Sequence, residues 1–322
     1  VSLNWTKIRE TIEGKRELDT DTFIYHWWLS KYEYTAQKKI YKEFRNNVTS
    51  VNAQLVLDDM VAASEYYRAI HDPEYWKWDK QESEIKSSLK AMNLFRVRQQ
   101  VPATLSLIRA FKAGTIKLGQ ISKALGEIEK FHFLFTAITS QRSSGGISGM
   151  YALLARHIAS VKNPQDATPV LKDLKTKLQD RVPNLAEFLA LFPGLLYTSR
   201  LTKERQLVKY VLSKISRASG HAFTADLEDL TIEHLVPQSS ISRIKWTEEI
   251  VGQLGNLILI TKDLNQKLEN KSFADKKALL LKHKCKDILP EYFWEADHLT
   301  PELIIRRTTE LAEFSYNSVW KI

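Results

Sequence analysis

The chain has 322 residues, of which 43 % are hydrophobic and 26 % are charged, a composition typical of a soluble globular protein rather than a disordered one. No apolar stretch approaches the roughly 18 uninterrupted residues that a membrane-spanning helix needs, so we expect no membrane partner. Because Cys285 is the only cysteine, an intrachain disulfide and a multi-cysteine zinc site are excluded, and we expect a reducing, cytoplasmic location.

The formal net charge of +9 favours a polyanionic partner, and this charge is unevenly distributed. Residues 221–322 hold 13 basic and 16 acidic side chains, whereas the first 220 hold 34 basic and 22 acidic ones. The excess of basic residues therefore lies in the N-terminal part. Residues 262–286 are a local exception, with eight lysines against three acids, although such a charge run is usually a solvated helix face.

The start of the chain has no basic flank followed by an apolar run, so it is not a signal peptide. It also lacks an initiator methionine. We interpret the chain as part of a longer protein that has a further N-terminal segment.

Residues 1–205 are predicted to form an all-helical domain. Apolar side chains recur at spacings of three and four over residues 85–95 and again over residues 121–138, which places them on single helix faces. The serine- and glycine-rich run 143–149 is predicted to be a loop. Alternating strand patterns are absent from this part of the sequence.

Aromatic residues gather early in the chain. Interleaved with basic residues they can stack on unpaired nucleotides, but at helical spacing they are more often part of a core, and we favour the core interpretation. The residues are Trp27, Trp28, Tyr32, Tyr34, Tyr66, Tyr67, Tyr75, Trp76 and Trp78.

Residues 206–322 are predicted to form a small α+β domain. Short apolar runs near 230–236 and 255–261 are typical of strands, and helices are expected over 263–270, 273–284 and 301–320. The fold class we expect is therefore mainly α, with an all-helical domain before a small α+β domain.

This second domain carries the groups that hydrolysis of a phosphodiester bond requires. His234 ends the first predicted strand, and its near-neutral pKa suits a general base. Glu233 offers the hard oxygen ligand that Mg²⁺ prefers, and the amide oxygen of Asn265 is a second candidate ligand. Asn256 opens the second strand, where its side chain can orient a loop or the histidine. Taken singly, each is as easily a surface or turn residue.

The motifs resemble a known nuclease signature. Residues Glu233–Gln238 (EHLVPQ), then Gly255–Leu257 (GNL), then Leu264–Lys271 (LNQKLENK) are similar to the HNH, or ββα-metal, nucleases. They most resemble the variant in GmrSD-like modification-dependent restriction endonucleases, and the first motif is also similar to the HNH domain of RNA-guided CRISPR nucleases. Four further residues are similar to the terminal helix region of the GmrSD-like family: Trp294, Arg306, Leu311 and Trp320.

The resemblance implies that Glu233 and Asn265 hold one Mg²⁺ or Mn²⁺ ion. It implies that His234 deprotonates the attacking water, that Asn256 keeps the loop bearing His234 in shape, and that the helix after the second strand contacts phosphate. The contact residues would be Lys267, Asn270 and Lys271. Because the third motif position is Asn rather than His, the site should favour hard cations over zinc or nickel.

The function that we expect from the resemblance is metal-dependent cutting or nicking of DNA in restriction of phage or modified foreign DNA. Relatives of this kind carry a ParB-like nucleotide-hydrolysing domain at the N-terminus, and no segment here resembles it, so it is a possible partner domain outside this sequence. Two alternatives stay open: a module that binds nucleic acid or regulates without cutting, and an RNA-directed HNH nuclease. The sequence leaves the oligomeric state undetermined.

Overall fold

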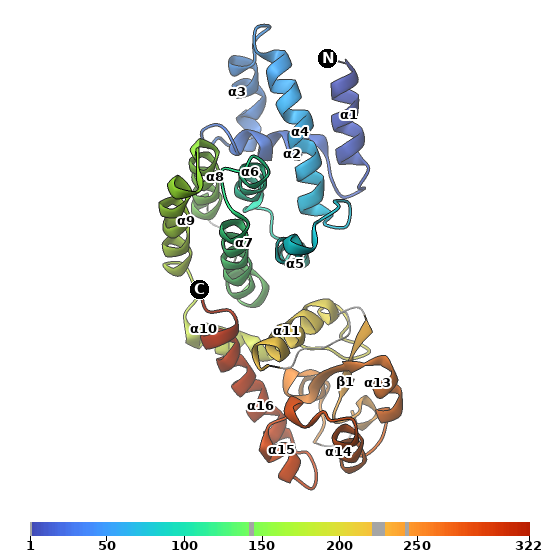
Figure 1. Cartoon of the computed structure of the whole chain (residues 1–322). Helices are drawn as coiled ribbons and strands as arrows, with labels where there is room; N and C mark the ends of the chain where they lie inside the picture. Colours follow the sequence, from blue (N-terminus) through green and yellow to red (C-terminus); the bar gives the residue numbers. More distant parts are fainter. Residues whose placement is uncertain (1, 142–144, 221–228, 242–244) are drawn as a thin grey trace. The chain divides into compact units, whose positions relative to one another are not determined.

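The computed structural model of the chain describes residues 2–141, 145–220, 229–241 and 245–322 (Figure 1). It divides into two compact units. Unit 1 comprises Val1–His132, Gln141–Val182 and Ile322, and unit 2 comprises Phe133–Ser140 and Pro183–Lys321.

Unit 2 begins earlier in the chain than the predicted boundary between residues 205 and 206. The reason is that α10 (Leu185–Leu191) and the short helix η4 (Phe192–Gly194) pack against α16 (Pro301–Phe314). The rings of Phe188 and Tyr316 lie 5.4 Å apart between their centroids. Residues 185–194 therefore share a core with the C-terminal helix.

The described residues of unit 1 form helices and no strand, as the sequence predicts. The helices are α1 (Ser2–Glu13), α2 (Thr20–Leu29), α3 (Ile40–Asn47), α4 (Ala53–His71), α5 (Ser83–Leu94), α6 (Val101–Lys112), α7 (Leu118–His132), α8 (Gly145–Ser160) and α9 (Pro164–Gln179). Two short 3₁₀ helices, η1 (Gln37–Lys39) and η2 (Lys80–Glu82), precede α3 and α5.

The core of unit 1 contains α6, which packs against α2, α4, α7 and α8. Trp27, Trp28 and Tyr67 are buried, in agreement with the core interpretation of the early aromatic residues. Tyr34 and Tyr75 are exposed and do not follow it.

The predicted loop at residues 143–149 is wrong from Gly145 onward, because α8 begins there. Ile147, Met150 and Tyr151 are buried at helical spacing, and this burial outweighs the weak helix propensity of the glycines. Residues 143 and 144 lie outside the described part of the chain.

Unit 2 contains a two-stranded antiparallel sheet in which β1 (Leu230–His234) pairs with β2 (Leu257–Thr261). The register places Glu233 opposite Ile258 and His234 opposite Leu257. Both strands and the two following helices, α13 (Lys262–Leu268) and α14 (Phe273–Lys282), lie close to where the sequence predicts them.

Unit 2 has further elements among its described residues. They are η3 (Phe133–Ile138), α11 (Arg205–Ala218), η6 (Gln238–Ser240), α12 (Glu248–Gly252), η7 (Leu254–Asn256), η8 (Lys286–Ile288), α15 (Glu291–Glu295) and η9 (Ser315–Val319). Of these elements, α11 packs against β2.

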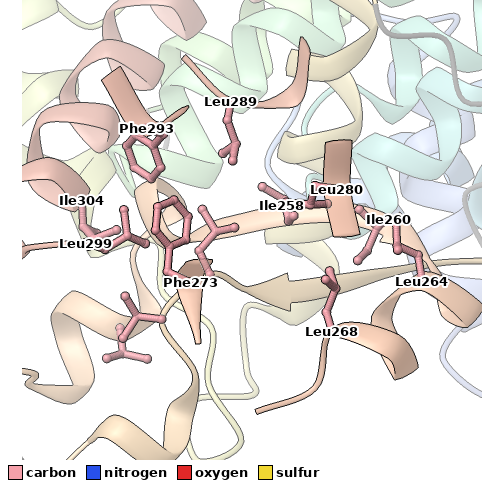
Figure 2. Close-up of a cluster of buried hydrophobic side chains, with 13 residues drawn as sticks. Ile258, Ile260, Leu264, Leu268, Phe273, Leu280, Leu289, Phe293, Leu299 and Ile304 are labelled. Carbon is pink, nitrogen blue, oxygen red and sulfur yellow. The ribbon is translucent and has the colours of Figure 1, made fainter. Parts of the chain in front are cut away.

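One face of the sheet is covered by an apolar core. Ile258 and Ile260 of β2 pack with Leu264 and Leu268 of α13, and Leu280 of α14 joins the same cluster (Figure 2). Residues two apart on a strand share a face, and residues four apart on a helix do the same. Because Ile258 and Ile260 share one face of β2 and Leu264 and Leu268 share one face of α13, these side chains determine which side of α13 packs on the sheet.

Buried histidines should make unit 1 sensitive to acid. Burial lowers the pKa of His132 to about 3, whereas in an unfolded chain the group titrates near 6.5. Between these values the unfolded chain binds a proton that the folded chain does not. Protonation of His132 in the unfolded chain therefore has no effect on folding stability above pH 6.5. Below pH 6.5 the free energy of unfolding falls by about 1.4 kcal/mol per pH unit.

The variant His132→Gln should show a correspondingly shallower loss of stability between pH 6.5 and pH 5, measured by hydrogen exchange of unit 1 amides. His157→Gln, at an exposed histidine of the same unit, is the matched control and should keep the original slope. Equal slopes for His132→Gln and the unaltered chain would contradict this account.

Candidate active site

Strand β1 places two neighbouring polar residues in buried surroundings. Glu233 and His234 are each 6 % exposed. Because consecutive side chains of a strand point to opposite faces, the two residues meet different partners. The Glu233 carboxylate bonds to side chains of α13 and α14, whereas the His234 ring bonds to the backbone near residue 197.

The Glu233 carboxylate is held at both oxygens. Lys276 Nζ donates to Oε1 at 2.5 Å, and Asn265 Nδ2 donates to Oε2 at 3.0 Å. Asn265 Nδ2 is also 3.3 Å from the carbonyl oxygen of Ile232. The fold thus brings together the two residues that the sequence analysis selected as metal ligands.

Lys276 is a site residue that the sequence analysis missed. Its side chain is fully buried, and its ammonium also donates to the carbonyl oxygen of His234 at 2.6 Å. Burial lowers the pKa of Lys276 and raises the pKa of Glu233, while the charge of each opposes the shift of the other. A signal was present in the sequence, since Phe273, Lys276 and Leu280 lie on the buried face of α14 at helical spacing.

The partner of His234 selects its tautomer. His234 Nε2 lies 2.9 Å from the carbonyl oxygen of Tyr197, and a carbonyl only accepts hydrogen bonds, so Nε2 carries the proton. Nδ1 is then the acceptor, and it lies 3.5 Å from Gln238 Nε2. Burial lowers the pKa of His234 to about 4, so the ring is neutral at pH 7.

The His234 ring does not contact Glu233 or Asn265 in the described structure. Its polar neighbours are Tyr197 and Gln238, and Gln238 is half-buried. The buried ring therefore keeps a lone pair on Nδ1 whose neighbour is the side-chain amide of Gln238, at a long distance of 3.5 Å. Tyr197 is a second residue that the sequence analysis missed, because a backbone carbonyl carries no sequence signal.

Asn256 is completely buried and braces the segment that follows β1. Its Oδ1 accepts from the amide of Val236 at 2.7 Å, and its Nδ2 donates to the carbonyl oxygens of Val236 and Val251. The amide of Leu235 donates to the Asn256 carbonyl oxygen. A single side chain thus fixes the backbone directly after His234, which is the position that the resemblance implies for it.

The turn before Asn256 is held against α16 by hydrogen bonds. Gly255 donates its amide to Thr308 Oγ1 at 3.1 Å, and the buried Arg307 donates to the carbonyl oxygens of Gly255 and Leu257. A Cβ atom at Gly255 would lie 2.0 Å from the carbonyl oxygen of Ile304. Only glycine lets η7 approach the helix this closely.

The three candidate nucleic-acid contacts are all exposed. Lys267 lies in α13, and Asn270 and Lys271 lie in the turn after it. Their side chains are open to solvent on the segment that carries Asn265. Within the described residues, no group of three or more His, Cys, Asp or Glu side chains gathers to hold a metal.

Comparison with known proteins assigns this part of the chain. Residues 188–314 match the family model described as GmrSD restriction endonucleases, C-terminal domain, and these residues contain every candidate site residue. This region is therefore similar to the C-terminal domain of GmrSD restriction endonucleases, in agreement with the resemblance that the motifs indicated. No curated protein matches the chain. None of its described helices combines the length and apolar character needed to cross a membrane.

The buried pair Lys276–Glu233 should be strongly coupled in stability. Lys276→Met leaves the carboxylate buried without its cation, and we expect a loss of about 3–5 kcal/mol in the unfolding free energy of unit 2. Lys276→Met combined with Glu233→Gln should recover much of that loss, because no buried charge remains unpaired. Denaturant unfolding of the two single variants and the double variant measures the coupling. If the losses of unfolding free energy in the two single variants simply add in the double variant, the two residues are not coupled and this prediction is wrong.

Gly255→Ala should destabilise unit 2 by about 1–3 kcal/mol, because η7 must move away from α16 to admit the methyl group. Gly194→Ala, in the same unit, is the matched control, since a Cβ atom there meets nothing within 4 Å. Thermal unfolding of both variants measures the effect. Equal melting temperatures for Gly255→Ala and the unaltered chain would argue against a close approach at this turn.

Proposed function

We propose that the chain is a metal-dependent HNH endonuclease that cuts or nicks DNA in restriction of phage or modified foreign DNA. The single observation that carries this proposal is the contact between Glu233 and Asn265 beside a neutral histidine whose Nδ1 is the acceptor. A two-stranded antiparallel sheet followed by a helix that brings Asn265 to the carboxylate is consistent with a ββα-metal arrangement. The match to a restriction endonuclease domain supports the same activity.

The residues present fit a hard divalent cation such as Mg²⁺ or Mn²⁺. The available donors are carboxylate and amide oxygens, and Mg²⁺ commonly binds one or two protein groups while water and phosphate supply the rest. Asn265 now turns its Nδ2 toward Glu233 Oε2, and a half-turn of the amide brings its oxygen there instead. When bound, the cation would stabilise charge on the scissile phosphate and on the leaving oxygen.

His234 is the proposed general base. The hydrogen bond from Nε2 to the Tyr197 carbonyl holds the ring in one orientation and leaves the Nδ1 lone pair to accept a proton from the attacking water. The lowered pKa keeps this lone pair available at neutral pH. Asn256 acts as a positioning residue, since it fixes the backbone beside His234 without touching the reacting atoms.

Lys276 is proposed to hold the carboxylate in place. Its bond to Glu233 Oε1 leaves Oε2 as the oxygen that faces Asn265, so the pair determines which oxygen is offered to a cation. The exposed Lys267, Asn270 and Lys271 then contact the DNA backbone next to the scissile bond. A nucleotide-hydrolysing ParB-like domain outside this sequence is a proposed partner.

Incubation of supercoiled plasmid with the chain and Mg²⁺ or Mn²⁺ tests the proposal. His234→Ala should lower the cleavage rate at least about 100-fold, the usual contribution of a general base, while DNA binding is retained. His283→Ala, at an exposed histidine of the same unit, is the matched control and should cut at the original rate.

Three results would contradict the proposal. Binding without cleavage by the unaltered chain would favour a non-cleaving or regulatory module. Preferential cleavage of a matched RNA would favour an RNA-directed nuclease. Equal rates for His234→Ala and the unaltered chain would remove the histidine from the mechanism.

A further inference from the structure

Helix α3 in unit 1 is unusual because none of its residues is buried. Its inner side contacts the unit through Phe44, whose ring centroid lies 6.1 Å from that of Trp27 and 6.2 Å from that of Trp28. Figure 1 shows α3 at the edge of unit 1. The helix thus rests on the core by one face and leaves the other open.

The open face carries cations at helical spacing. Lys38, Tyr41, Lys42 and Arg45 recur at i, i+3, i+4 and i+7, which places them on one stripe along η1 and α3. All four are exposed, and 74 % of Tyr41 is open to solvent. Glu43, the one acidic residue of α3, falls outside this stripe.

The charges of the stripe are not neutralised within the described chain. Several other surface cations of unit 1 are paired, as Lys31 is with Asp59 and Lys86 with Glu74. Lys38, Lys42 and Arg45 have neither an ion pair nor a side-chain hydrogen bond to any described residue, a pattern that suits a partner bearing regularly spaced negative charge. An exposed aromatic ring among them adds a surface on which an unpaired base can stack.

We propose that the stripe Lys38, Tyr41, Lys42 and Arg45 binds the phosphate backbone of the DNA substrate. This inference rests on the proposed function for the identity of the polyanion. The contact is independent of sequence, because cations on a helix face read phosphate rather than base edges. It adds affinity through a unit that lies outside the match to the restriction endonuclease domain.

Fluorescence anisotropy of a labelled DNA duplex tests the stripe. The whole chain carrying His234→Ala is used in EDTA, so that no cleavage interferes. Adding Lys38→Gln, Lys42→Gln and Arg45→Gln together should raise Kd at least about tenfold at 100 mM salt, and should reduce the slope of log K against log salt by about 2–3, near 0.9 for each lost phosphate contact. Circular dichroism verifies the fold, which these exposed positions should leave unchanged.

Lys80→Gln, Lys123→Gln and Lys172→Gln together form the matched control, with the same loss of charge at exposed lysines on η2, α7 and α9. This control should leave the salt slope unchanged. Three outcomes would each overturn the inference. The two triple variants could have equal effects, the parent chain could fail to bind DNA, or the chain could bind anionic phosphatidylserine vesicles in preference to DNA.

The outcomes separate this inference from the proposed function. If the unaltered chain does not cut plasmid but the stripe variant loses DNA binding, the stripe stands and the hydrolytic proposal fails. If the unaltered chain cuts plasmid but the stripe variant binds DNA as the parent does, the hydrolytic proposal stands and the stripe inference fails.

Discussion

The ion pair between Glu233 and Lys276 is the interaction on which the site depends. A carboxylate on β1 and an ammonium 43 residues further along the chain meet in a buried setting, where neither is tolerated without the other. The same ammonium donates to the His234 carbonyl oxygen, so one side chain holds the Glu233 carboxylate and the backbone of the next residue. Helix α14 is thereby tied to the end of β1, and the turn between α13 and α14 is drawn to the site with its exposed Lys271 and Asn270.

The opposite side of the site is fixed by hydrogen bonds between side chains and the backbone rather than by an ion pair. Asn256 bonds to Val236 and Val251, and α16 holds the turn before it through Arg307 and Thr308. Burial lowers the pKa of Arg307 to about 10, which still leaves it charged at neutral pH. The residues after β1 are therefore braced by three elements. Such a rigid frame suits the general base that we propose His234 to be, because that base must meet its water in one geometry.

Much of the second unit follows from local sequence. The apolar runs of β1 and β2 and the periodicity of α13 predict a sheet followed by a helix. That Glu233 and Asn265 come together is implied by the resemblance to the HNH signature, and the two side chains are in contact. The helical spacing of Lys276 with Phe273 and Leu280 places it on the buried face of α14, but its partner lies on a distant segment that this spacing does not identify. Tyr197 could not be selected, because it acts through a carbonyl that every residue possesses. The glycine-rich start of α8 was misjudged, since tertiary burial of Ile147 and Tyr151 overrides local propensity.

A crystal structure of the chain soaked with Mn²⁺ tests the central claim most directly, because the anomalous signal of the ion locates it without reference to activity. The account predicts one peak with the Glu233 carboxylate and the Asn265 amide oxygen as ligands, at about 2.0–2.2 Å for a hard cation of this size, and with Lys276 still bonded to the other carboxylate oxygen. A peak at any other group of side chains, or no peak while Asn265 Nδ2 still donates to Glu233, would contradict it.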